Sequence, residues 1–160
     1  MTDSLFDPVP VVRHESTGYV ICEFEGMTLA IPQSDVITIE QGSELSAALP
    51  GETALGWFAS ADGPWPAYAL NCDLKLHSTL PDARTFLVFV RSQPLPLGLL
   101  CESIRIVRDN FSAAPLPDVM REPNGFVQRV VRLARGQLAL ICESGGIAEY
   151  LADQTLERAA

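Results

Sequence analysis

The sequence is poor in positive charge. It has a single lysine and 11 basic residues against 20 acidic ones, which gives a net charge of −9. Nucleic-acid binding needs a basic face that neutralises phosphates, and docking on an anionic membrane also needs basic side chains, so the composition argues against both. No run approaches the ~18 consecutive apolar residues of a membrane-spanning helix. The first residues have neither a basic start nor an apolar run, so we expect no signal peptide and a cytoplasmic protein.

Cysteine and histidine, which often serve as nucleophiles, bases and metal ligands, are also scarce. Four cysteines are spread along the chain without a C-x-x-C pair: Cys22, Cys72, Cys101 and Cys142. Three of them lie in apolar runs, which favours packing as small hydrophobic residues in a reducing compartment over a zinc site. His14, in the N-terminal arm, and His77, in a polar loop, are interpreted as solvated surface residues.

The usual motifs of catalysis and cofactor binding are missing as well. The sequence contains no G-x-S-x-G elbow, no phosphate-binding loop and no G-x-G-x-x-G. Those spacings are how a nucleophile or a phosphate cradle is ordinarily recognised in a sequence. We therefore expect no catalytic residue, no cofactor and no metal.

What the chain does have is apolar content, 48% of 160 residues, which suits one domain with a sizeable core. Short apolar segments separated by turn residues at about 8–12-residue spacing predict many strands, as in barrels and sandwiches. Strands are expected over residues 18–25, 27–31, 36–39, 56–59, 65–69, 85–90, 97–101, 104–107, 126–133 and 137–142. Loops are expected over 41–55 and 109–125, a short helix over 70–76, and a C-terminal helix after Gly145 and Gly146.

Charge is divided unevenly along the chain. Up to Leu74 there are 11 acids and one base, and from Lys75 onward there are 9 acids and 10 bases. This division favours two subregions with different outer surfaces, or two halves that complement each other electrostatically. Arg105 and Arg108, on a mainly apolar strand, are interpreted as a solvated face, with a docking patch as the alternative.

Aromatic residues gather around one predicted hairpin. Its turn is the segment 61–64, Ala-Asp-Gly-Pro, flanked by Trp57, Phe58, Trp65 and Tyr68. In a small barrel such side chains usually belong to the core. Trp65 is the one that could instead anchor a protein partner, because interfaces favour tryptophan at their desolvated centres.

Several motifs follow one another in a characteristic order. The segment 19–32 is an apolar strand, a tight turn and a second strand that ends in L-A-I-P. An L-P-G run begins at Leu49, a glycine opens the next strand at Gly56, and a G-L-L-C-E-S-I run begins at Gly98. The order and spacing of these motifs resemble the CheW-like domain, the adaptor module of bacterial chemosensory arrays. The resemblance covers about residues 18–151, most of the chain.

The departures from the family's pattern are mainly polar positions. Thr38 replaces the strand glutamate, and an asparagine, an arginine, a glycine and an aspartate are replaced by Ala59, Ala61, Asp62 and Ala69. The lost arginine lies in the family's partner-binding region, and its loss removes a rigid, multidentate donor. The resemblance therefore implies a divergent adaptor.

For the fold, the resemblance implies a mostly β protein of two interlocked, small, SH3-like, five-stranded β-barrels with a C-terminal helix. The expected organisation is a flexible N-terminal arm over 1–17, a CheW-like domain over 18–151, and a helix end or tail over 152–160. The two barrel halves are expected at about 30–84 and 85–142, with the first hairpin shared.

For the function, the resemblance implies a non-enzymatic scaffold that links a histidine kinase of the CheA type with the cytoplasmic tip of a chemoreceptor or another protein. The system would be chemotaxis or type IV pilus (twitching) signalling. Two alternatives stay open: a small-ligand-binding β-barrel sensor, and a CheW-like module reassigned to a different protein partner. The candidate partner-binding residues are Thr38, Ala61, Asp62, Gly63 and Trp65.

Overall fold

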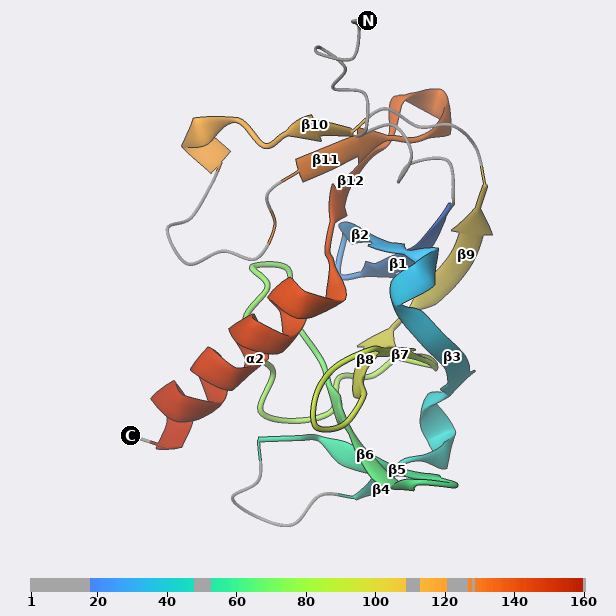
Figure 1. The fold of residues 1–160 in the computed structure, drawn as a ribbon, viewed down its shortest axis with the longest axis vertical. Helices are drawn as coiled ribbons and strands as arrows, with labels where there is room; N and C mark the ends of the chain where they lie inside the picture. Colours follow the sequence, from blue (N-terminus) through green and yellow to red (C-terminus); the bar gives the residue numbers. More distant parts are fainter. Residues whose placement is uncertain (1–17, 48–52, 109–112, 121–126, 128, 160) are drawn as a thin grey trace, which may run out of the picture.

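The computed structural model describes residues 18–47, 53–108, 113–120, 127 and 129–159 (Figure 1). The protein is mostly β with one C-terminal α-helix, which confirms the predicted fold class. Its strands form two sheets of six strands each, where five were expected. The predicted arm over 1–17 lies outside the described residues. No helix in the described part of the chain is long and apolar enough to cross a membrane.

The first sheet is built from segments near the two ends of the described chain. Its strands are Tyr19–Phe24 (β1), Met27–Pro32 (β2), Ser103–Val107 (β9), Ala113–Pro115 (β10), Arg129–Arg132 (β11) and Leu138–Ile141 (β12). They lie in the order β10–β11–β12–β2–β1–β9, with β12 and β2 as the parallel pair. Glu25 and Gly26, both with positive φ, make the tight turn between β1 and β2.

The second sheet is built from the middle of the chain. Its strands are Val36–Gln41 (β3), Ser46–Ala47 (β4), Gly56–Ser60 (β5), Gly63–Tyr68 (β6), Phe86–Val90 (β7) and Leu97–Cys101 (β8). They lie in the order β3–β7–β8–β6–β5–β4, with β6 and β8 as the parallel pair. The edge strands are therefore β3 and β4 in this sheet, and β9 and β10 in the first.

The two sheets interlock because the second is inserted in the sequence between β2 and β9. The chain leaves the first sheet through a 3-10 turn, Gln33–Asp35, and returns to it at Ser103. This division differs from the predicted halves at about 30–84 and 85–142, since β7 and β8 pair with β3 and β6. Apolar alternation locates a strand in the sequence, but it does not say which strand will be its partner.

Three clusters of buried side chains form the core. The largest lies between the sheets and combines residues of β1, β2, β7 and β8 with residues of the C-terminal helix, Ser144–Ala159 (α2). The other two lie on the opposite faces: one contains Tyr19 and Ile21 of the first sheet, and the other contains Trp65 and Phe89 of the second. Because both sheets contribute to the largest cluster, neither sheet could bury its apolar surface alone.

Helix α2 covers one side of the shared cluster (Figure 1). Ile147 and Leu151 are buried, and Tyr150 packs against the same cluster, which confirms the apolar face predicted from their spacing. The helix begins at Ser144, before the two glycines that were expected to precede it. The carboxylate of Asp35, from the turn that leads into β3, accepts a hydrogen bond from the Ser144 N–H at 2.9 Å.

Two predicted loops contain short edge strands. β4 lies within the expected loop over 41–55, and β10 lies within the expected loop over 109–125. Strands of two and three residues are too short to show an alternation of apolar and polar side chains. These two strands are the additional members of the six-stranded sheets.

The helix expected over 70–76 is wrong. The Asn71 side chain accepts hydrogen bonds from the N–H groups of Asp73 and Lys75, at 2.8 and 3.0 Å, and Leu74 has a φ of 62°. An asparagine that bonds its own neighbouring backbone competes with helix formation. The segment is therefore a turn.

Gly98 on β8 gives a test of how tightly the second sheet is packed. A Cβ atom there would lie 2.7 Å from Cε1 of Phe89 and 2.9 Å from Cδ1 of Leu87. We expect Gly98→Ala to lower the free energy of unfolding by about 1–3 kcal/mol, because buried side chains must move to admit a methyl group. Gly145→Ala is the control, since no atom lies within 4 Å of its Cβ position, and it should be neutral or stabilising. Urea denaturation measures both, and a Gly98→Ala variant as stable as the native chain would contradict the packing.

Candidate functional site

Thr38, one of the predicted partner-binding residues, lies on the edge strand β3. Ile37 and Ile39 on this strand are exposed at 39% and 36%, whereas Thr38 and Glu40 are half-buried. The Thr38 hydroxyl donates a hydrogen bond to Oε2 of Glu40 at 2.8 Å. Residues two apart on a strand share a face, so Thr38 and Glu40 lie on the same face of β3, and the Thr38 hydroxyl holds the Glu40 carboxylate there.

A third exposed isoleucine, Ile106, lies on β9, the edge strand of the first sheet, and is 48% exposed. Ile106 pairs with Val20 and Ile39 pairs with Val88, and both partners belong to the cluster between the sheets. Cross-strand partners share a face, so Ile39 and Ile106 face the same layer and emerge at its margin. Figure 1 shows β3 and β9 along the same side of the molecule. We call Ile37, Ile39 and Ile106 the isoleucine rim.

The rim combines apolar side chains with free strand edges. Among the described strands, β3 is paired only with β7, and β9 only with β1. An unpaired edge presents backbone N–H and C=O groups, and exposed apolar side chains beside it add a driving force for docking. The arrangement suits binding to another polypeptide.

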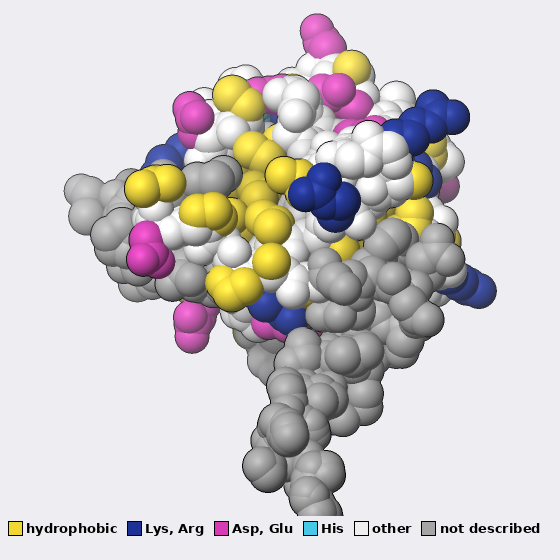
Figure 2. All heavy atoms as spheres, turned by 90° about the horizontal axis from the view of Figure 1, so that it is seen from above, with side chains coloured by type: hydrophobic (Ala, Val, Ile, Leu, Met, Phe, Trp, Pro, Cys, Tyr) yellow, Lys and Arg dark blue, Asp and Glu magenta, His cyan; other side chains and the backbone are white. Residues whose placement is uncertain are grey.

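Other apolar side chains are exposed at the end of the molecule formed by the first sheet. Figure 2, the view from above, shows hydrophobic side chains gathered there between charged ones. In this part of the chain Leu138 is 54% exposed, and Val119, in the 3-10 turn Asp118–Met120, is 93% exposed. Exposed apolar residues that stand singly are normal on a protein surface, so these two carry no argument of their own.

The other predicted partner-binding residues belong to the β5–β6 hairpin. Ala61 and Asp62 are exposed at its tip, and Gly63 has a φ of 109°. The Ser60 hydroxyl closes the turn, since it donates to the Gly63 carbonyl and accepts a hydrogen bond from the Asp62 N–H at 3.1 Å. The tip is an ordered turn that offers one carboxylate and a methyl group. Three strands separate β5 from β3 in the sheet order, so strand pairing does not bring Thr38 to this tip.

Trp65 is a core residue of the second sheet. Its side chain packs edge-on against Phe89, with ring centroids 5.2 Å apart, and lies 6.4 Å from the ring of Phe58. The residue is 9% exposed, and its indole Nε1 has no hydrogen-bond partner among the described residues. Trp65 thus supports the hairpin from inside. The partner-binding role of Trp65 and of the other four residues stays a prediction.

Arg84, in the connection between β6 and β7, is a buried charge at the junction of the sheets. Its Nη1 donates to the Leu100 carbonyl at 3.0 Å, and its Nη2 donates to the Leu70 carbonyl at 2.8 Å and to Oε2 of Glu25 at 2.7 Å. The guanidinium also lies over the Phe24 ring, 4.7 Å from its centroid, where the ring face attracts a cation. The side chain is completely buried.

Glu25, in the β1–β2 turn, is the anion that Arg84 meets. Its carboxylate also accepts hydrogen bonds from Nε2 of His77 at 2.6 Å and from the N–H of Cys72 at 3.2 Å. Its own N–H donates to the carboxylate of Glu102 at 3.1 Å. The bond with His77, with smaller contributions from Cys72 and Arg84, lowers the pKa of the Glu25 carboxyl below its ordinary value of 4.5.

This network holds segments together. The interpretation of His77 as a solvated residue is wrong, because its side chain is 28% exposed and bonded to Glu25. The carboxylate oxygens of Glu25 accept hydrogen bonds from three different parts of the 70–84 connection. These hydrogen bonds connect the β1–β2 hairpin of the first sheet to the 70–84 connection of the second sheet.

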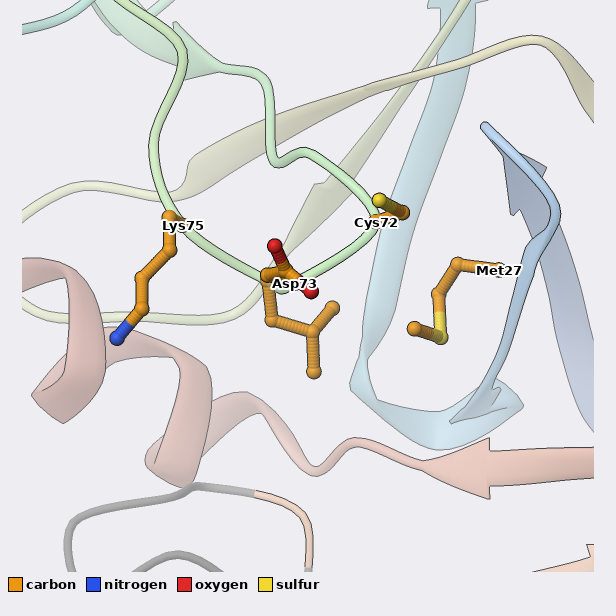
Figure 3. A pocket seen from close by; sticks show the side chains of 5 residues that line it. Met27, Cys72, Asp73 and Lys75 are labelled. Carbon is orange, nitrogen blue, oxygen red and sulfur yellow. The ribbon is translucent and has the colours of Figure 1, made fainter.

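An open hollow lies beside this network, between the turn that follows β6 and the start of β2. Met27, Cys72, Asp73, Leu74 and Lys75 line it. Figure 3 shows the Lys75 amine turned toward α2, with Met27 on the opposite side of the hollow. The hollow is open to solvent, and its lining has one acid, one base and one cysteine, so it does not enclose a ligand as small-molecule sites do. Among the described residues, no group of three metal-ligating side chains could hold a metal ion.

Known proteins resemble this chain in sequence and in fold. A family model described as the CheW-like domain matches residues 18–150. Among solved structures, the scaffolding protein TtCheW from Thermoanaerobacter tengcongensis is similar, with a TM-score of 0.63 and 14% identity. That match covers 79% of this chain and 88% of the other, and at this identity it shows the fold alone. No curated protein matches the sequence.

The Glu25 network predicts a pH dependence of stability. Because the folded-state pKa of Glu25 is lowered, its stabilising contribution is fully present above the ordinary value of 4.5 and is lost as the pH falls through the lowered pKa. We expect Glu25→Gln to lower the melting temperature at pH 7 and to reduce the further fall between pH 5 and pH 3. Glu149→Gln, at an exposed position of α2, controls for the loss of one charge. Native and Glu25→Gln chains that lose stability in parallel on acidification would contradict this role.

The buried position of Trp65 predicts that replacing this side chain lowers the stability of the fold. Trp65→Ala should lower the free energy of unfolding by about 3–5 kcal/mol, because a large side chain between two aromatic rings is lost from the core. Trp65→Phe is the matched control: it keeps an aromatic ring and removes the unpartnered indole N–H, so it should cost clearly less. Urea denaturation separates the two variants. A Trp65→Ala chain of native stability that has lost a binding partner would instead make Trp65 a surface anchor.

Proposed function

The chain belongs to the CheW-like domain family, and on that premise we propose that it is a non-enzymatic adaptor in a bacterial chemosensory system. The proposed partners are a CheA-type histidine kinase and the cytoplasmic tip of a chemoreceptor or another signalling protein. Chemotaxis and type IV pilus (twitching) signalling are the proposed settings, and both place the protein in the cytoplasm.

The isoleucine rim is the single observation that supports this proposal most strongly. Its three exposed side chains stand at the margin of the core, on edge strands from both sheets. An apolar segment of a partner that lies along this margin would remove Ile37, Ile39 and Ile106 from water at once. Burial of this kind, at the centre of an interface, accounts for most of the binding energy in typical complexes.

The proposed mechanism is bridging. A partner held at the rim and a second partner held elsewhere, for example at the exposed tip around Ala61 and Asp62, would be kept close to each other. Their effective concentration would rise without any chemical step by the adaptor. The β5–β6 tip has lost the family's arginine, so its contacts would be weaker than a bidentate arginine pair. The rim would therefore contribute most of the affinity.

The packing on the outer faces of the two sheets favours the adaptor over a small-ligand sensor. Tyr19, Ile21 and Val131 belong to the buried cluster of the first sheet, and Trp65 and Phe89 to that of the second. A sensor needs an enclosed apolar cavity with a few converging polar groups. A CheW-like module with a different protein partner would use the same rim.

The adaptor proposal predicts that Ile39→Asp weakens partner binding. The substitution places a carboxylate where an apolar contact forms, so the affinity for the receptor tip or the kinase of the same organism should fall at least about tenfold. Leu80→Asp is the matched control, because Leu80 is 55% exposed and belongs to the β6–β7 connection, not to either rim strand. Surface plasmon resonance with purified partners measures both variants.

The fold of each variant is checked by thermal melting before binding is measured. If the native chain binds neither a kinase nor a receptor of its organism, the proposed function is wrong. If the native chain binds and both aspartate variants bind equally well, the function stands and the rim is not the site.

A further inference from the structure

Seventeen residues precede Gly18, and the structure shows where that segment leaves the folded domain. Gly18 lies against β9, since a Cβ atom at this position would be 2.8 Å from the Val107 carbonyl oxygen and 3.2 Å from Cγ of Arg108. Its own carbonyl accepts a hydrogen bond from the Gln33 N–H at 3.1 Å, just before β3. The segment therefore leaves the domain between the end of β9, which carries Ile106, and the turn that leads into β3.

The rim is within reach of this segment. Tyr19 pairs with Val107, so Ile106 is the next residue along β9 from the exit point. Ile39 lies six residues beyond Gln33, which places it at most about 25 Å from Gly18 at ~3.3 Å per residue. Residues 5–12 stand 6–13 residues before Gly18 and can extend about 20–43 Å from it.

The composition of residues 5–12 fits an apolar strand edge. The stretch reads L-F-D-P-V-P-V-V, with five large apolar side chains among eight residues. Its two prolines remove backbone donors, which restricts such a stretch to the edge of a sheet or to an extended segment beside it. They also narrow the conformations of the free segment, which lowers the entropy lost when it binds.

We propose that residues 5–12 dock on the isoleucine rim in the free protein and so compete with the partner that binds there. The occupant of the rim is thus a segment of the same chain, at high effective concentration because it is tethered at Gly18. The contact itself is independent of the proposed adaptor function, whereas the competition rests on it. The segment would act as an autoinhibitory cover that a stronger partner displaces.

A spin-label experiment on the full chain tests the contact. Ser4→Cys in a Cys72→Ser background carries a nitroxide, because Cys72 is exposed and the other three native cysteines are buried. We expect strong broadening of the amide signals of Ile37, Ile39 and Ile106, and little at the β5–β6 tip. The matched control adds Leu5→Asp and Phe6→Asp, which should abolish the broadening at the rim. Broadening that avoids the rim, or that persists unchanged in the control, would overturn the proposal.

Partner affinity tests the competition separately. If the segment covers the rim nine-tenths of the time, Leu5→Asp with Phe6→Asp should raise the affinity of the full chain about tenfold, because the apparent affinity scales with the uncovered fraction. An unchanged affinity would overturn the competition. If no kinase or receptor binds the native chain, the adaptor function fails, and the spin-label result still decides whether the segment docks.

Discussion

The buried guanidinium of Arg84 fixes how the two sheets lie against each other. A buried cation costs free energy unless its charge is compensated and its donors are bonded. Here the Leu70 carbonyl, two residues after β6, the Leu100 carbonyl on β8 and the Glu25 carboxylate bond the two terminal nitrogens, whereas Nε has no hydrogen-bond partner among the described residues. Glu25 comes from the β1–β2 turn of the first sheet, and the two carbonyls come from β8 and from the connection that follows β6. The charge is therefore compensated only when both sheets are in place.

The same constraint positions the free edges. β7 follows Arg84 directly and pairs with β3, while β9 follows β8 after Glu102, whose carboxylate is bonded to the backbone of Glu25. Strand β3 is therefore connected to the network through its partner β7, and strand β9 is connected to it through Glu102. A rim built on β3 and β9 is formed before any partner arrives, so a partner does not have to order it.

Local patterns predict much of the fold, and long-range contacts decide the site. The hairpin of Tyr19–Pro32 and the apolar face of α2 follow from alternation and helical spacing, whereas the turn at Asn71 depends on one side-chain conformation. Ile39 looks like a core residue in the sequence, and it is exposed only because β3 is an edge strand. The bond between Glu25 and His77 spans 52 residues and leaves no local signal. Trp65 could not be assigned to core or surface because its strand is apolar on both faces.

The polar changes on β3 alter which partners the rim can select. Apolar burial is non-directional, so three isoleucines supply affinity with little discrimination, and specificity needs directed polar groups beside them. The tip of the β5–β6 hairpin has a methyl group at Ala61 in place of a cationic fork. On β3, the Thr38 hydroxyl holds the Glu40 carboxylate on the face opposite the exposed isoleucines. A partner strand that pairs with this edge presents side chains to both faces, so a basic side chain on the Glu40 face would satisfy the carboxylate and an acidic one there would be repelled. In this chain, discrimination between partners would therefore depend on β3 more than on the hairpin.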